Sequence, residues 1–308
     1  MQIPPFSLSK QLSELGPDLD TALLRVLHSG HYIGGEEVQA FEESFAQIIG
    51  VPYVVGCNSG TDALVLALRA LDIGAGDEVI TSSFSFFATA EAISGVGASP
   101  VFVDVEPVNY LIDLSQVEKA ITNKTKAILP VHLFGCPVDM DRLRTLANKY
   151  GLKIIEDCAQ ACGSKWNGLS VGSWGDIGCF SFFPTKNLGA VGDAGAVTTK
   201  NADIAQRIRQ LAVHGMPCRY LHTELGYNSR LDAIQAAVLN VKLPRLASWV
   251  KQRQIIASRY IELLKNLPAF DLPVNLTEIN IVHTWNQFVV RVKSVYSKET
   301  PFQQQLDS

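Results

Sequence analysis

The sequence lacks any long uninterrupted apolar segment of the kind that crosses a membrane. Its richest apolar segment, residues 63–73, is interrupted by Arg69 and Asp72, whereas a membrane helix needs about 18 consecutive apolar residues. The N-terminus also lacks the basic stretch followed by an apolar one that marks a secretory signal. We therefore expect a soluble, cytoplasmic protein with no membrane partner.

Signals for several common ligands are missing as well. The chain carries 26 Lys and Arg against 30 Asp and Glu, for a net charge of -4, so nothing favours binding to nucleic-acid phosphates. It contains no Gly-Lys pair, which a P-loop requires, and no G-x-G-x-x-G turn after the first apolar strand, which dinucleotide binding requires. Nucleoside triphosphatases and nicotinamide dehydrogenases are thereby disfavoured.

The six cysteines are scattered through apolar segments and form no ligand set with zinc spacing. They are typical of buried, reduced thiols, and we expect no metal site. The segment 168–172 matches the G-x-S-x-G pattern of serine hydrolases. That motif needs a buried strand before it, and here a polar segment precedes it, so a hydrolase is not expected.

From residue 51 to about 215, short apolar segments alternate with segments of helical periodicity, which predicts βαβ units around a mainly parallel sheet. The expected strands are residues 53–57, 78–81, 101–105, 127–131, 153–156, 178–182 and 196–199. The expected helices between them are residues 63–71, 88–96, 114–121 and 140–150.

After residue 203 the pattern becomes helical, with expected helices at 231–239 and 250–267 and Pro244 between them as a breaker. A short strand at 288–292 and a helix at 300–306 follow. We therefore expect a large domain over residues 1–245 and part of a small α/β domain over residues 246–308. The small domain looks truncated, because one or two strands have little core of their own.

Lys186 lies in the segment Ser-Phe-Phe-Pro-Thr-Lys-Asn, residues 181–187, between two apolar strands. Most loop lysines are solvated. Aromatic, Pro and Gly neighbours, however, can desolvate this amine and favour its neutral form, which can form a Schiff base with an aldehyde cofactor.

Two further segments carry polar groups at strand ends. Asp157, in Glu-Asp-Cys-Ala-Gln at residues 156–160, ends an apolar strand, where open α/β sheets bind ligands. It could pair with a protonated pyridine nitrogen or simply cap a helix. Residues 59–64, Ser-Gly-Thr-Asp-Ala-Leu, lie between a strand and a helix, which suits either a phosphate seat or ordinary capping.

These three motifs, in this order and spacing, resemble the sugar aminotransferases of the DegT/DnrJ/EryC1/StrS family. Similarity extends over about residues 8–292 and includes segments 31–35, 130–135, 139–141 and 228–232. The resemblance implies the aspartate aminotransferase-like fold type I of pyridoxal 5'-phosphate enzymes, with a large mixed, mainly parallel sheet flanked by helices. It also implies a homodimer with active sites shared between subunits.

The family pattern, carried over residue by residue, implies specific roles. Lys186 would hold the cofactor as an internal aldimine and move protons between cofactor and sugar. Asp157 would bind the pyridinium nitrogen and Gln160 the ring hydroxyl. Phe86 would stack on the ring, although Phe84 or Phe87 could be confused with it. Gly60, Thr61 and Ser181 would bind the phosphate of the cofactor. Asn228 would reach the phosphate of the cofactor in the neighbouring subunit. Arg230 is a weaker candidate for contacting the substrate.

The expected reaction moves an amino group from an amino acid, with L-glutamate favoured, to a nucleotide-linked keto-sugar. Gln160 favours a 3-keto sugar, since 4-aminotransferases of the family often have His there. Lys186 argues against the relatives that carry His in its place and act as dehydratases. Family members usually continue for some 60 further residues. Two alternatives therefore stay open: an inactive cofactor-binding relative with a regulatory or structural role, and a sugar dehydratase.

Overall fold

A seven-stranded sheet forms the centre of the computed structural model, which describes residues 7–273 and 280–293. The strand order is β1-β9-β8-β5-β4-β2-β3. Neighbours from β3 to β8 are parallel, whereas β9 is antiparallel to both β8 and β1. The expected mainly parallel mixed sheet is confirmed. Its strands are β1 (Tyr53–Cys57), β2 (Glu78–Ser82), β3 (Ser99–Val103), β4 (Thr125–Leu129), β5 (Lys153–Asp157), β8 (Ile177–Ser181) and β9 (Gly195–Thr199).

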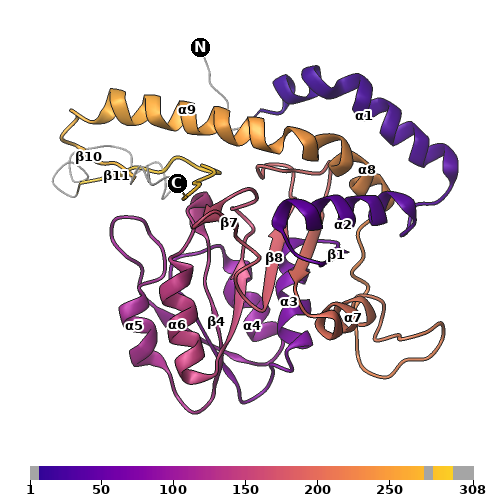
Figure 1. Cartoon of the computed structure of the whole chain (residues 1–308), viewed down its shortest axis with the longest axis horizontal. Coiled ribbons are helices and arrows are strands. Elements are labelled where there is room, and N and C mark those ends of the chain that lie inside the picture. The colour runs from indigo at the N-terminus through magenta and orange to yellow at the C-terminus, as the bar shows by residue number, and fades with distance from the viewer. Residues whose placement is uncertain (1–6, 274–279, 294–308) are drawn as a thin grey trace, which may run out of the picture.

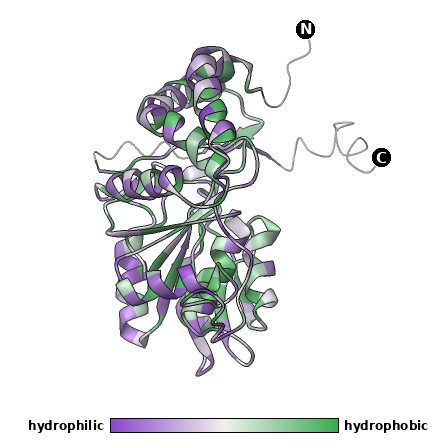
Figure 2. Cartoon of the chain, turned by 90° about the vertical axis from the view of Figure 1, so that its right-hand side faces the viewer, coloured by the Kyte–Doolittle hydropathy of each residue, from purple (hydrophilic) through white to green (hydrophobic). Residues whose placement is uncertain are grey.

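Helices enclose this sheet, and Figure 2 shows its apolar strands between helical layers. α3 packs against β5, β8 and β9, while α2 packs on β1 and α8, and α1 covers α8. α9 extends along the top of the molecule in Figure 1, with the two-stranded β10–β11 ribbon beside its far end. The helices are α1 (Ser9–Ser29), α2 (Glu36–Ile49), α3 (Gly60–Ala70), α4 (Phe87–Gly95), α5 (Leu114–Ala120), α6 (Met140–Tyr150), α7 (Ala202–Leu211), α8 (Ala233–Lys242) and α9 (Leu246–Leu264).

Local signals explain where helices begin and end. In α6, the N-cap Asp139 accepts a hydrogen bond from the backbone N–H of Arg142 at 3.1 Å. Met140 and Leu143 bury one face, and Gly151 ends the helix with φ +65°, a left-handed conformation that glycine adopts without strain. α3 begins in the same way, with the hydroxyl of Ser59 accepting from the N–H of Asp62 at 3.0 Å.

The structure shifts some of the expected elements. β3 and β4 begin two residues before the expected strands at 101–105 and 127–131. Pro244 lies in a short 3-10 turn, Leu243–Arg245, which separates α8 from α9. Of the expected strand at 288–292, only β11 (Arg291–Val292) is formed, paired with β10 (Phe270–Asp271). The expected helix at 300–306 lies outside the described residues.

No helix in the described part of the chain is both long enough and apolar enough to span a bilayer. The six cysteines are unpaired, and all but Cys218 are buried, in agreement with the prediction of reduced thiols. α1, α2 and α7 were not predicted as elements.

Candidate active site

The lysine loop, residues 182–190, leaves the end of β8 and is anchored at both ends. Phe182 is fully buried and packs edge-on against Phe41 and Phe45, each with ring centroids 5.3 Å apart. The N–H of Ala190 donates back to the carbonyl of Phe182 at 2.8 Å. Lys186 is half-buried between these anchors. Its pKa is lowered by burial, and the charge of Asp157 acts in the opposite direction.

Asp157 ends the neighbouring strand β5 and is 5% exposed. Its carboxylate accepts hydrogen bonds from the hydroxyl of Thr89 at 2.9 Å and from the N–H of Ala159 at 3.0 Å. Burial raises its pKa, against these hydrogen bonds and the charge of Lys186. No salt bridge joins Asp157 to Lys186 within the described part of the chain, so each remains available to a ligand. Sequence reasoning missed Thr89, which α4 brings from 68 residues away.

Gln160 follows β5 by three residues, and its amide has a defined orientation. Its side-chain oxygen accepts the N–H of Phe134 at 2.7 Å. The amide nitrogen has no acceptor among the residues that the structure describes. Since an amide carries its donors opposite its acceptor, this nitrogen can donate to a ligand oxygen.

Gly60 and Ser181 are brought together although they are 121 positions apart. A Cβ on Gly60 would lie 2.6 Å from Cβ of Ser181, so the first turn of α3 reaches the end of β8 only because residue 60 has no side chain. Thr61 is the next residue of the same turn. The amides of a first helical turn lack intrahelical acceptors, so those of Gly60 and Thr61, together with the Ser181 hydroxyl, could serve as an anion seat at this helix N-terminus.

Phe86 immediately precedes α4 and is 73% exposed. The hydroxyl of Ser85 is 2.9 Å from that of Thr89, which holds this segment beside Asp157. Phe87 is equally exposed, whereas Phe84 packs against Tyr110 and Phe134 with ring centroids 5.8 and 6.3 Å apart. Phe84 is thus directed toward these two rings, although it is still 48% exposed.

Asn228 and Arg230 are not brought into this cluster. The guanidinium of Arg230 donates to the side-chain oxygen of Asn228 at 2.5 Å. Arg230 lines a different groove, between α7 and the start of α2, and Asn228 is exposed. Between them, the hydroxyl of Ser229 donates to the side-chain oxygen of Asn58 at 3.1 Å, two residues before Gly60.

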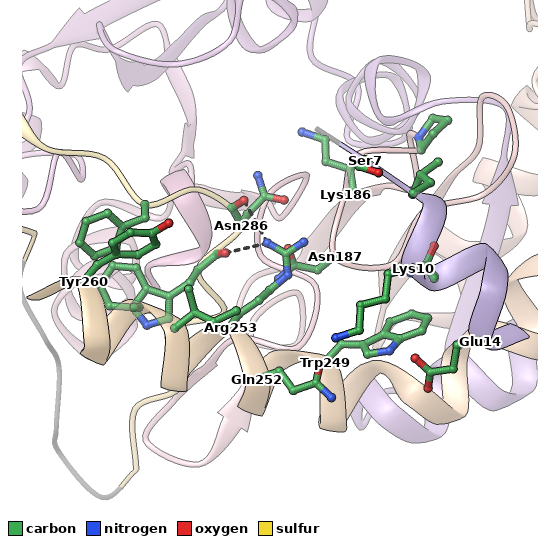
Figure 3. A pocket seen from close by; sticks show the side chains of 17 residues that line it. Ser7, Lys10, Glu14, Lys186, Asn187, Trp249, Gln252, Arg253, Tyr260 and Asn286 are labelled. Carbon is green, nitrogen blue, oxygen red and sulfur yellow. Dashed lines mark hydrogen bonds between the residues drawn. The ribbon is translucent and has the colours of Figure 1, made fainter. Parts of the chain in front are cut away.

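Lys186 also borders a cleft of about 470 Å³. Figure 3 shows Lys10 and Glu14 of α1 on one side of this cleft, and Trp249, Gln252 and Arg253 of α9 along it. Of the residues expected to hold the cofactor, Lys186 alone lines this cleft, which therefore lies beside the site and does not coincide with it.

A second buried cluster, His132, Glu156 and Cys158, places three potential metal ligands within 4.8 Å of one another. Its polar groups are already used. The carboxylate of Glu156 accepts from His132 Nε2 at 3.0 Å and from three backbone N–H groups of residues 172–175. His132 Nδ1 accepts the N–H of Val138 at 3.0 Å. The cluster is a structural network, as is common for a lone histidine.

The site thus offers an amine of lowered pKa, a carboxylate, an amide donor and an anion seat, all around the ends of β1, β5 and β8. A ligand that engages all of them carries an aldehyde, a basic ring nitrogen, a ring hydroxyl and a phosphate, and pyridoxal phosphate has this set of groups. Fold and site together define a pyridoxal-phosphate-dependent enzyme of fold type I.

Residues 14–308 match the family model described as the DegT/DnrJ/EryC1/StrS aminotransferase family. The chain belongs to this family, as its motifs predict.

Relatives of this chain bear names of two kinds. It is 47% identical over 292 residues to UDP-N-acetyl-3-dehydro-alpha-D-glucosamine 3-aminotransferase of Acidithiobacillus ferrooxidans, covering 95% of this chain and 78% of the relative. It is 45% identical to a pleiotropic regulatory protein of Geobacillus stearothermophilus, covering 94% and 78%. Among solved structures, S. venezuelae DesV in complex with a ketimine intermediate matches with a TM-score of 0.93 at 43% identity, over 99% of this chain and 81% of DesV.

Proposed function

We propose that the protein transfers the amino group of an amino acid, with L-glutamate as the expected donor, to a nucleotide-linked 3-keto sugar. The observation that carries this proposal is that Lys186, in the loop after β8, interacts electrostatically with Asp157 at the end of the adjacent strand β5, while burial lowers the pKa of the amine. A keto-sugar substrate is supported by the family and by the name of the relative from A. ferrooxidans.

The side chains would divide the work of holding and using the cofactor. Asp157 would pair with the pyridine nitrogen, and its hydrogen bonds from Thr89 and Ala159 hold the carboxylate in place. The amide nitrogen of Gln160 would donate to the ring hydroxyl. Gly60, Thr61 and Ser181 would bind the phosphate, and Phe86 would cover one ring face. Bound pyridoxal phosphate would supply an electron sink. Lys186 Nζ would hold the cofactor by condensing with its aldehyde, with release of water, and once freed would carry the proton exchanged during transfer.

An absorbance titration with glutamate tests the proposal. The purified, cofactor-loaded protein should absorb near about 420 nm and shift toward about 330 nm when glutamate is added, as the cofactor accepts the amino group. A band that stays unchanged when glutamate is added would support the alternative of an inactive, cofactor-binding relative. That alternative is kept because the relative from G. stearothermophilus bears a regulatory name. Formation of a sugar product without nitrogen would support a dehydratase.

Asp157→Asn should slow transfer by roughly 10²-fold or more, because an amide does not stabilise a protonated ring nitrogen.

The same Asp157→Asn variant should make the cofactor-free protein more stable at neutral pH. Burial raises the pKa of Asp157, so its contribution to stability is present in acid and is lost as pH rises through the raised value. Urea unfolding at pH 4 and pH 8 measures this, and a variant less stable than wild type at pH 8 would contradict it.

We further propose that two copies of the chain form the complete site. The segment between α7 and α8 extends away from the body of the molecule in Figure 1. Of the residues that the structure describes, it carries the most exposed large apolar side chains, Tyr220 at 80% and Leu225 at 86%. Asn228 lies at the end of the same segment, outside its own chain's cluster. A second subunit would bury these side chains, and Asn228 would then lie at the phosphate of the cofactor bound by that second subunit.

Light scattering should therefore give twice the chain mass of 33.6 kDa. The double variant Tyr220→Glu and Leu225→Glu should weaken dimerisation about tenfold or more. It removes two apolar side chains from the interface, and the loss of such anchors has effects of this size or larger. Leu169→Glu, at a side chain that is 52% exposed elsewhere, is the matched control. A wild type that stays monomeric with cofactor bound would refute the shared site.

The domain division remains a proposal as well. We place it at the 3-10 turn Leu243–Arg245, in line with a large domain over residues 1–245 and part of a small one over residues 246–308.

A further inference from the structure

A short segment, residues 283–287, crosses beside the lysine loop and is named here the strap. It makes hydrogen bonds to four separate parts of the chain: the turn at Phe134 and Gly135, Ser164, Asn187 and α9. On one side its contacts reach Asn187, the residue next to Lys186. On the other side they reach Phe134, which bonds Gln160.

On the Gln160 side, the strap holds the turn at Phe134 and Gly135. The N–H of Thr284 donates to the carbonyl of Gly135 at 3.0 Å, and the N–H of Asn286 donates to the carbonyl of Phe134 at 2.9 Å. A Cβ on Gly135 would overlap with the hydroxyl of Thr284, so this close approach requires glycine. Phe134 in turn donates its N–H to the side-chain oxygen of Gln160 at 2.7 Å, which sets the direction of the Gln160 amide.

On the lysine side, one side chain makes the connection. Asn187, directly after Lys186, is 4% exposed and donates from Nδ2 to the carbonyl of Thr284 at 3.0 Å. Its side-chain oxygen is buried and has no hydrogen-bond partner among the described residues. An unpaired buried oxygen is costly, so an apolar side chain of similar size would be expected here if packing alone mattered.

The strap is anchored on α9 through Arg253. Its guanidinium Nη1 donates to the carbonyls of Trp285 at 3.0 Å and Asn286 at 3.3 Å, and Figure 3 shows Arg253, Asn187 and Asn286 grouped in one part of the cleft. Trp285 has φ +49°, a conformation that persists in non-glycine residues only where the surroundings impose it. The indole ring of Trp285 stacks on His283 with centroids 3.8 Å apart, and the backbone N–H of Trp285 donates to His283 Nδ1 at 3.0 Å.

We propose that Asn187 is a positioning residue for Lys186: it ties the lysine loop to the strap, so that the amine of Lys186 and the amide of Gln160 are held in one rigid unit anchored on α9 by Arg253. This inference rests on the proposed function for its meaning, because those two groups act on the same cofactor. The coupling itself is a property of the chain alone.

Hydrogen exchange on the cofactor-free protein tests the coupling. Asn187→Leu keeps the branched shape of the side chain, though it is larger, and removes the donor. Asn187→Ala removes both the donor and most of the side chain. Either variant should speed exchange at least about tenfold in residues 133–136 as well as in the lysine loop, since loss of one hydrogen bond changes a local equilibrium by about that factor. Arg253→Lys should act on the same two regions from α9. Asn240→Ala, which removes a similar bond from Asn240 Nδ2 to the carbonyl of Glu37 at 3.0 Å, should affect neither.

Absorbance of the cofactor-loaded protein gives the second readout. The pH midpoint of the band near about 420 nm should move by about one unit in Asn187→Leu, which is a tenfold change in equilibrium, and stay unchanged in Asn240→Ala. Faster exchange confined to the lysine loop, or a wild-type midpoint in Asn187→Leu, would overturn the proposal. If wild type shows no such band, the proposed function fails, and exchange alone still decides whether the strap couples the two loops.

Discussion

Lys186→Ala should abolish the glutamate-driven absorbance shift and lower turnover by on the order of 10⁴-fold or more, the effect expected when a covalent catalytic group is removed. The charge of Asp157 acts on the amine of Lys186, and burial lowers the pKa of that amine. Lys186→Arg should fail to the same extent, because a guanidinium stays protonated and forms no Schiff base. Both variants should keep their thermal stability, since Lys186 is only half-buried in a loop.

Lys242 provides the matched control for that experiment. Burial lowers the pKa of this lysine too, without a contribution from Asp157. Its amine donates to the carbonyl of Gly189, near the end of the lysine loop, at 2.7 Å. Lys242→Met should therefore retain the glutamate-dependent shift while losing stability. A Lys186→Ala protein that still shows the shift would rule out the assigned role of Lys186.

Glu156→Ala should lower the free energy of unfolding by about 3–5 kcal/mol, as when one partner of a buried charged network is removed. The carboxylate is fully buried and accepts from His132 and from the N–H groups of Gly172, Trp174 and Gly175. Without it, four buried donors lose their acceptor. Urea unfolding of the cofactor-free protein measures the loss.

Glu118→Ala is the comparison for Glu156. Glu118 bonds Lys149 at 2.6 Å and Tyr150 at 2.8 Å on the exposed surface, where solvent screening makes an ion pair weak, so the loss of stability should be far smaller. Similar losses for the two variants would show that Glu156 does not hold a network. The size of the difference matters for function, because Glu156 directly precedes Asp157 and orients the end of β5.

Strand positions were predictable because buried parallel strands form apolar segments whose composition is local. All seven strands of the sheet appear within two residues of the predicted limits. The order β1-β9-β8-β5-β4-β2-β3 and the antiparallel β9 were not predictable from those segments, because strand pairing depends on long-range packing. α1 was missed for a related reason: Pro17 interrupts its pattern, and its buried face is defined only by packing on α8.

The sequence by itself determined the class of chemistry and the family. Lys186, Asp157 and the turn at Gly60 lie in motifs whose residue types and order are readable without coordinates. Tertiary structure alone decided how these groups are arranged: Thr89 on Asp157, Gly60 against Ser181, and the strap between Asn187 and Phe134. The physical reason is that a motif specifies which groups are available, whereas hydrogen-bond geometry and close contact between distant segments exist only once the chain has packed.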